Sequence, residues 1–111
     1  MVSIKSLVLS AIPIFAITGS AADCYGKNPR ASVDDSWKAR DAYCGNDLWK
    51  SQNVFISNGV QIVMTSPGSN SRQVCWDAFE NIINQCRKSG KFNIGLYHYG
   101  DVEYSMSWGP G

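Results

Sequence analysis

Hydrophobic residues recur at helical spacing most clearly between about Arg72 and Cys86. The repeat of three and four residues places one set of side chains on a single helix face: Cys75, Ala78, Phe79, Ile82 and Cys86. Asn70 is the expected N-cap of this helix, because Gln73 follows three residues later as in a capping box. Gly90 is the expected stop. The pattern therefore predicts a helix with one buried stripe in the second half of the chain.

Another helix is predicted earlier in the chain, from Ser32 to about Cys44. Ser32 can cap its start, and two aspartates follow in the first turn, where the helix dipole favours negative charge. Gly45-Asn46 is expected to end this helix. The preceding segment, residues 23–31, contains a glycine and a proline and is predicted to be irregular.

Alternating patterns predict two pairs of strands. Residues 47–56 and 60–65 flank Ser57-Asn58-Gly59, and the Asn-Gly pair favours the left-handed backbone of a tight hairpin turn. In the tail, a two-residue turn at Gly100-Asp101 would place one set of side chains on a single face: Tyr97, Tyr99, Val102, Tyr104, Met106 and Trp108. The element order is then α-β-β-α-β-β, or α-β-β-α-β if the last hairpin is one bent strand.

The first 22 residues have the pattern of a secretory signal peptide. Lys5 supplies the positive charge, residues 7–17 form a short apolar stretch that Pro13 interrupts, and small residues precede the expected cleavage after Ala22. The apolar stretch is too short to span a bilayer as a helix. We therefore expect residues 23–111 to form one secreted domain with no membrane attachment after cleavage.

The four cysteines, Cys24, Cys44, Cys75 and Cys86, are expected to form two disulfides outside the cell. Cys75 and Cys86 would lie about 16 Å apart along one helix, which is too far for a bond between them. The first helix ends at Cys44, and a hairpin then leaves and returns, so that the second helix starts nearby. The helices are therefore antiparallel, and the pairs are Cys44–Cys75 and Cys24–Cys86. We expect an α+β fold in which both helices pack on one face of a small antiparallel sheet.

Charge argues against a general nucleic-acid or anionic-membrane binder. The chain has ten Lys and Arg and nine Asp and Glu, and removal of Lys5 with the signal peptide leaves nine of each and a net charge of zero. Polyanion binding needs clustered positive charge. One local basic spot is present, at Arg87, Lys88 and Lys91.

Catalysis would depend on His98, the one histidine of the chain. In the hairpin register His98 lies opposite Glu103, and such a pair can do acid–base work in small ribonucleases. That chemistry usually needs a second acid–base group and a phosphate-binding arginine, for which Arg40 or Arg72 would have to approach. An exposed cross-strand pair is the simpler interpretation, so we do not expect an enzyme.

No metal or cofactor is expected. The cysteines lack the close pairs of zinc modules, and the acidic residues lack the spacing of a calcium loop. Phosphate-binding glycine loops and serine-nucleophile turns are also missing from the sequence.

One stretch resembles a known group of proteins. The segment from Cys75 to Cys86, then Gly90, Gly95 and the aromatic-rich residues 96–101, is similar to the C-terminal half of small secreted fungal glycan-binding proteins of the ink-cap mushroom type, the "Y-three" group. Members of that group carry further cysteines, including one near the C-terminus, whereas this chain has none after Cys86. The resemblance implies a fungal secreted α/β domain that binds glycans.

The aromatic tail is the candidate ligand-binding region. Flat aromatic rings stack on sugars, and nearby carboxylates bind their hydroxyls. Four aromatic residues and one acid are therefore the candidates: Tyr97, Tyr99, Asp101, Tyr104 and Trp108. The alternative is that the same face packs under the helices, an interpretation that is favoured for Tyr97 and Tyr104 and balanced for Tyr99 and Trp108.

These observations predict a secreted, non-catalytic protein that recognises a glycan at a host or competitor surface. Two alternatives stay open. One is a secreted effector or toxin whose partner is a host surface protein, and the other, less favoured, is a small ribonuclease-like hydrolase. Zero net charge argues against a membrane-lytic toxin, which would need a cationic amphipathic face.

Overall fold

The structure, a computed structural model, describes residues 21–109, so the predicted signal peptide lies outside it except for Ala21 and Ala22. Strands and helices follow in this order: β1 (Asp23–Tyr25), α1 (Val33–Gly45), the 3-10 helix η1 (Leu48–Lys50), β2 (Val54–Ser57), β3 (Val60–Met64), α2 (Arg72–Ile82), its π-helical continuation η2 (Ile83–Lys88), β4 (Ile94–Tyr99) and β5 (Val102–Ser107). In this part of the chain, neither helix has the length and hydrophobicity that crossing a membrane requires.

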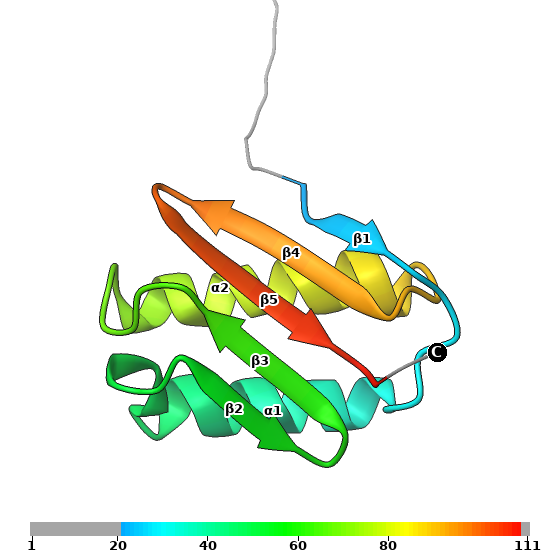
Figure 1. Cartoon of the computed structure of the whole chain (residues 1–111), viewed down its shortest axis with the longest axis horizontal. Coiled ribbons are helices and arrows are strands. Elements are labelled where there is room, and N and C mark those ends of the chain that lie inside the picture. The colour runs from blue at the N-terminus through cyan, green and yellow to red at the C-terminus, as the bar shows by residue number, and fades with distance from the viewer. Residues whose placement is uncertain (1–20, 110–111) are drawn as a thin grey trace, which may run out of the picture.

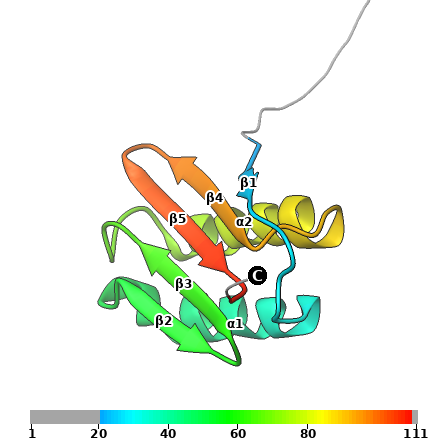
Figure 2. The ribbon, with the colours of Figure 1, turned by 45° about the vertical axis from the view of Figure 1, so that its right-hand side comes forward.

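The strands form one antiparallel sheet in the order β1-β4-β5-β3-β2, and both helices cover the same face of it (Figure 1). Among the residues that the structure describes, no helix covers the other face (Figure 2). The expected α+β fold is therefore confirmed. Tyr99 pairs with Val102 across Gly100-Asp101, so the tail is a two-residue hairpin and not one bent strand.

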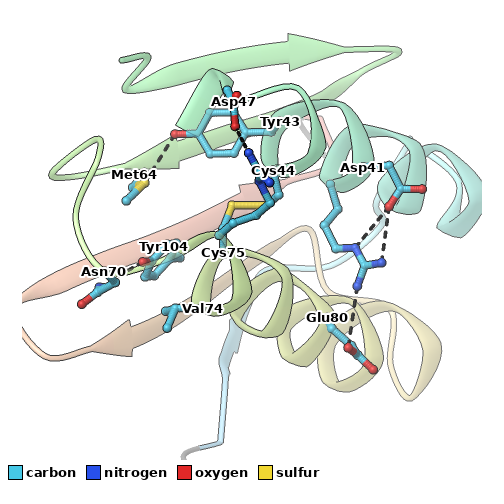
Figure 3. The surroundings of a disulfide bond; sticks show 12 residues. Asp41, Tyr43, Cys44, Asp47, Met64, Asn70, Val74, Cys75, Glu80 and Tyr104 are labelled. Atoms are coloured by element: carbon cyan, nitrogen blue, oxygen red, sulfur yellow. Dashed lines mark hydrogen bonds and ion pairs between the residues drawn. A yellow bond between two sulfur atoms is a disulfide. The ribbon is translucent and has the colours of Figure 1, made fainter. Parts of the chain in front are cut away.

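Both predicted disulfides are present. Cys44–Cys75 joins the end of α1 to the start of α2, with a Cα–Cα distance of 5.8 Å (Figure 3). Cys24–Cys86 joins β1 to η2, with a Cα–Cα distance of 5.4 Å. The two bridges thus lie at opposite ends of the antiparallel helix pair, as expected from the path of the chain.

The core lies between the helices and the sheet. Phe79 of α2 makes edge-to-face contacts with Tyr104 of β5 and Tyr43 of α1, at ring-centroid distances of 5.6 and 5.9 Å. Gly95 of β4 lies directly under α2: a Cβ there would be 2.6 Å from Ile82 Cγ2 and 2.8 Å from Cys86 Sγ. The helix can approach the sheet this closely only because Gly95 has no side chain.

The prediction of irregular structure for residues 23–31 is wrong at its start. Asp23–Tyr25 form β1, and Cys24 pairs with Gly95 of β4. Three residues are too few to show a strand period, and the pairing partner lies far along the chain. In the sequence, Cys24 is the one sign that this segment is fixed to the rest of the domain, because it is predicted to form a disulfide with Cys86.

The predicted strand at residues 47–56 begins later than expected. Asp47 has a left-handed backbone with φ of 63°, Leu48–Lys50 form η1, and β2 starts at Val54. Trp49 lies in the core, and the short helix is what turns it inward. The Asn58-Gly59 turn between β2 and β3 does have the expected positive φ values, 50° and 81°.

Ser71, not Asn70, caps α2. The Ser71 hydroxyl accepts a hydrogen bond from the Val74 backbone N–H at 3.2 Å, and its backbone is extended, as an N-cap requires. Asn70 has φ of 63°, which is incompatible with capping, and its side chain turns instead toward Tyr104.

Candidate ligand-binding surface

The β4–β5 hairpin divides its side chains between the two faces of the sheet. The aromatic residues of the tail, with Val102 and Met106, lie on the face toward the helices, and His98 and Glu103 lie on the open face. This division is the one that the alternation predicted. Its consequence is that most of the candidate aromatic residues point into the domain.

Tyr104 and Trp108 are fully buried. The Tyr104 ring packs on Phe79, and its hydroxyl accepts a hydrogen bond from Asn70 Nδ2 at 3.1 Å. The Trp108 ring packs under the guanidinium of Arg87, with 5.5 Å between the Arg87 Cζ and the ring centroid. Their burial argues against a stacking role for either ring, and packing under the helices accounts for both.

Tyr99 and Asp101 stay accessible at the tip of the hairpin. The Tyr99 side chain is 48% exposed, and Asp101 lies in the exposed turn. Burial raises the pKa of Tyr104, the hydrogen bond from Asn70 lowers it, and the nearby Tyr99 raises it further. Tyr99, Asp101 and Asn70, whose amide reaches Tyr104 of β5, are the accessible residues at this end of the hairpin, and we call these three residues the hairpin-tip cluster. Tyr97 is half-buried against the core and is set back from this group.

The hairpin-tip cluster combines the groups that a sugar needs. An exposed phenol ring can stack on the C–H face of a pyranose, and the carboxylate and the amide can bind its hydroxyls. The sequence did not indicate Asn70 as a member, because its contact with Tyr104 joins a loop to a strand 34 residues away. No local pattern encodes such a contact.

His98 and Glu103 meet as expected on the open face, with 3.2 Å between Nε2 and Oε2. The arginines that catalysis would need are engaged elsewhere. Arg72 pairs with Asp47, and Arg40 pairs with Asp41 and Glu80 (Figure 3). The His98 and Glu103 side chains are 57% and 39% exposed, respectively. The arrangement is that of a solvated cross-strand pair.

Arg40 holds the two helices together on their outer side. Its Cζ lies 4.9 Å from the Trp37 ring centroid of α1 and 4.5 Å from the Trp76 ring centroid of α2. Stacking on indole rings suits the flat, weakly hydrated guanidinium. Both tryptophans pack partly against the core. We interpret this group as a clamp between α1 and α2.

The open face of the sheet carries most of the exposed apolar side chains. The strand register aligns one row of residues across all five strands, in the order Tyr25, Ile94, Ser107, Gln61 and Ile56. Four of the five large hydrophobic residues that are exposed lie on this face: Tyr25, Val54, Ile56 and Ile94. Tyr25, at 52%, is as exposed as Tyr99. The sequence did not indicate Tyr25, because β1 was not predicted.

Within residues 21–109, no group of three or more histidine, cysteine, aspartate or glutamate side chains is arranged to hold a metal ion. All four cysteines are in disulfides. Four acidic residues instead pair with lysine or arginine: Asp34, Asp41, Asp47 and Glu80. The hydrogen bond from Arg72 lowers the pKa of the Asp47 carboxyl group.

Comparison with protein families identifies the family to which this chain belongs. The family model described as alpha-galactosyl binding lectin (LDL) matches residues 31–107, which is most of the described chain. A search of curated proteins finds no match. The matched residues include both helices, strands β2 to β5 and the whole hairpin-tip cluster.

Proposed function

We propose that this chain, which belongs to the alpha-galactosyl binding lectin family, is a secreted, non-catalytic protein that binds glycans ending in α-linked galactose. The family match over residues 31–107 carries the proposal. The exposed aromatic and polar groups at the hairpin tip support it, because they offer stacking and hydroxyl recognition.

In this proposal the sugar stacks on Tyr99. The Asp101 carboxylate accepts hydrogen bonds from the sugar hydroxyls, and the Asn70 amide can both donate and accept. Tyr97 supports the Tyr99 strand from the core side, and the buried Tyr104 holds Asn70 in place by accepting a hydrogen bond from its amide. The buried Trp108 has no contact with the ligand.

The proposed setting is extracellular, with the mature chain beginning at Asp23. Two disulfides in a small domain suit an oxidising compartment. The resemblance of residues 75–86 and 96–101 to secreted fungal glycan-binding proteins supports a fungal source and a target on a host or competitor surface. The glycan would then be part of that surface.

A glycan array with the oxidised chain from Asp23 onward tests the function. We expect binding to glycans with terminal α-linked galactose and weaker or no binding to the matched β-linked glycans. Tyr99→Ala should weaken binding about fivefold or more, because loss of a stacking ring costs on the order of 1 kcal/mol. Tyr25→Ala is the matched control: it removes an equally exposed tyrosine from the open face and should leave binding unchanged.

Three results would contradict the proposal. Absence of glycan binding by folded, oxidised protein would favour a protein target. Normal binding by a folded Tyr99→Ala variant would exclude the hairpin-tip cluster as the site. Degradation of RNA that is lost in His98→Ala would make the pair His98–Glu103 catalytic, whereas we expect this substitution to change sugar binding little.

A further inference from the structure

Positive charge is segregated within residues 21–109, although acidic and basic residues are equal in number there. Residues 21–109 contain nine lysines and arginines, and four of these form ion pairs: Lys38, Arg40, Lys50 and Arg72. The other five form no ion pair with any carboxylate of this part of the chain: Lys27, Arg30, Arg87, Lys88 and Lys91.

All five unpaired cations lie at one end of the domain, which we call the basic end. Lys27 and Arg30 belong to the link between β1 and α1, and the other three belong to the end of η2 and the link to β4. Figures 1 and 2 show these two links side by side. The Asn93 backbone N–H donates to the Tyr25 carbonyl at 3.0 Å, which joins them directly.

Covalent and polar contacts hold the basic end in place. The Cys24–Cys86 bridge ties β1 to η2. Arg87 donates from one terminal nitrogen to the Ala31 carbonyl at 2.6 Å and stacks on Trp108. The Trp108 carbonyl accepts hydrogen bonds from the backbone N–H groups of Arg30 and Ala31, at 2.7 and 3.2 Å. The links that carry the five cations are therefore ordered before any ligand arrives, which lowers the entropic cost of binding.

Arg87 is the best-fixed cation of the group, and its charge is not compensated. Its Nε is buried and has no hydrogen-bond partner within residues 21–109. Burial lowers the pKa of the guanidinium, which nevertheless stays charged at neutral pH. The other four cations are exposed around it. Such a group attracts a negatively charged ligand more strongly than the same charges would if each were paired.

We propose that the basic end is a second ligand site, distinct from the hairpin-tip cluster, and that it binds anionic groups on glycans, such as sulfates or uronic acid carboxylates. The choice of a glycan over other polyanions rests on the proposed function. Sulfates and carboxylates both suit Lys and Arg donors.

Heparin affinity chromatography of the oxidised chain tests this site. Lys88→Gln/Lys91→Gln removes two exposed cations of the basic end. Lys38→Gln/Lys50→Gln is the matched control, because it lowers the net charge equally but removes cations that are paired elsewhere. We expect the first variant to bind heparin about two- to thirtyfold more weakly and to elute at lower salt. The control should elute close to the unmodified protein.

Hyaluronan, which carries carboxylates without sulfates, separates the two anion sources. If the protein is retained on heparin but not on hyaluronan, the site binds sulfate. If it is retained on both, the site accepts either sulfate or carboxylate. Both results support the site as long as the Lys88/Lys91 variant loses retention. Binding to α-galactosyl glycans, measured on the same variants, should be unchanged in both. The proposal for the basic end and the proposal for the hairpin-tip cluster can therefore be tested independently.

Several outcomes would overturn the proposal. These are no retention of the unmodified protein at low salt, equal weakening in the two charge variants, or retention on single-stranded DNA that is as strong as on heparin and is lost in Lys88→Gln/Lys91→Gln. Absence of retention would exclude an anion site. Equal weakening would mean that retention depends on net charge alone, and equally strong retention on DNA would make nucleic acid the ligand.

Discussion

Tyr43 shows at the scale of one residue how this core accommodates polar groups. Its ring is fully buried between Phe55 and Phe79, and its hydroxyl donates to the Gln52 carbonyl at 2.6 Å. Burial, together with the neighbouring Tyr104, raises the pKa of Tyr43 to about 12. The hydrogen bond joins α1 to the link before β2, so the phenol serves both packing and connection.

The raised pKa of Tyr43 predicts a loss of stability in alkali. In the unfolded chain this phenol ionises near pH 10, as a free tyrosine does, but in the folded protein only near pH 12. Its contribution to stability is therefore full below pH 10 and is lost as the pH rises to about 12. Urea unfolding midpoints should fall over this range, and less steeply for Tyr43→Phe.

At neutral pH the same variant should lose about 1 kcal/mol, because the Gln52 carbonyl loses its donor. Lysines also titrate in alkali, so the informative quantity is the difference between the two pH profiles. Parallel profiles would mean that the Tyr43 pKa is the same in the folded and unfolded states.

At the scale of elements, the sequence predicts what local periodicity encodes. The stripe from Cys75 to Cys86 predicts α2, and the alternation around Gly100-Asp101 predicts the β4–β5 hairpin. Elements defined by distant partners escape such patterns: β1 needs β4, and η1 depends on the burial of Trp49.

The candidate site was predictable to a smaller extent. Tyr99 and Asp101 follow from the turn, because residues beside a hairpin turn are seldom covered. Tyr104 and Trp108 have the same alternation as Tyr99, and only the position of the helices decides which rings are buried. The contact between Asn70 and Tyr104 depends on a left-handed residue in a loop, which the sequence does not indicate.

The close approach of α2 to β4 gives a prediction at this scale. Gly95→Ala would put a methyl group 2.6 Å from Ile82 Cγ2, so helix and strand would have to separate. We expect a loss of about 1–3 kcal/mol in the free energy of unfolding, measured with urea. Gly45→Ala is the control, because its methyl group would meet Trp76 at an ordinary 3.5 Å and should change stability by less than about 1 kcal/mol. Equal losses in both variants would contradict the packing argument.

At the scale of the whole molecule, stability depends strongly on the two disulfides. A domain of this size has a small core, and its net stability is typically about 5–15 kcal/mol. The bridges close loops with sequence separations of 31 and 62 residues, and both reduce the conformational entropy of the unfolded chain. The longer separation belongs to Cys24–Cys86, which also fixes the basic end.

Removal of either bridge should therefore cost about 4 kcal/mol of unfolding free energy at most, slightly more for Cys24→Ala/Cys86→Ala than for Cys44→Ala/Cys75→Ala. Denaturant unfolding of both double variants measures this. If Cys24→Ala/Cys86→Ala stays folded, heparin retention should fall while α-galactosyl binding persists, because β1 and its link are released but the hairpin is not. A loss below about 1 kcal/mol in both variants would show that packing alone holds the fold.

The basic end and the hairpin tip lie at opposite ends of β4. A molecule adsorbed through its basic end on a sulfated matrix would be oriented, with the tip directed away from the matrix toward whatever approaches it. Adsorption would also confine the protein to a layer and raise its local concentration there. The sugar sites of neighbouring molecules would then form a dense layer of equally oriented receptors, and the salt concentration would determine how firmly this layer is retained.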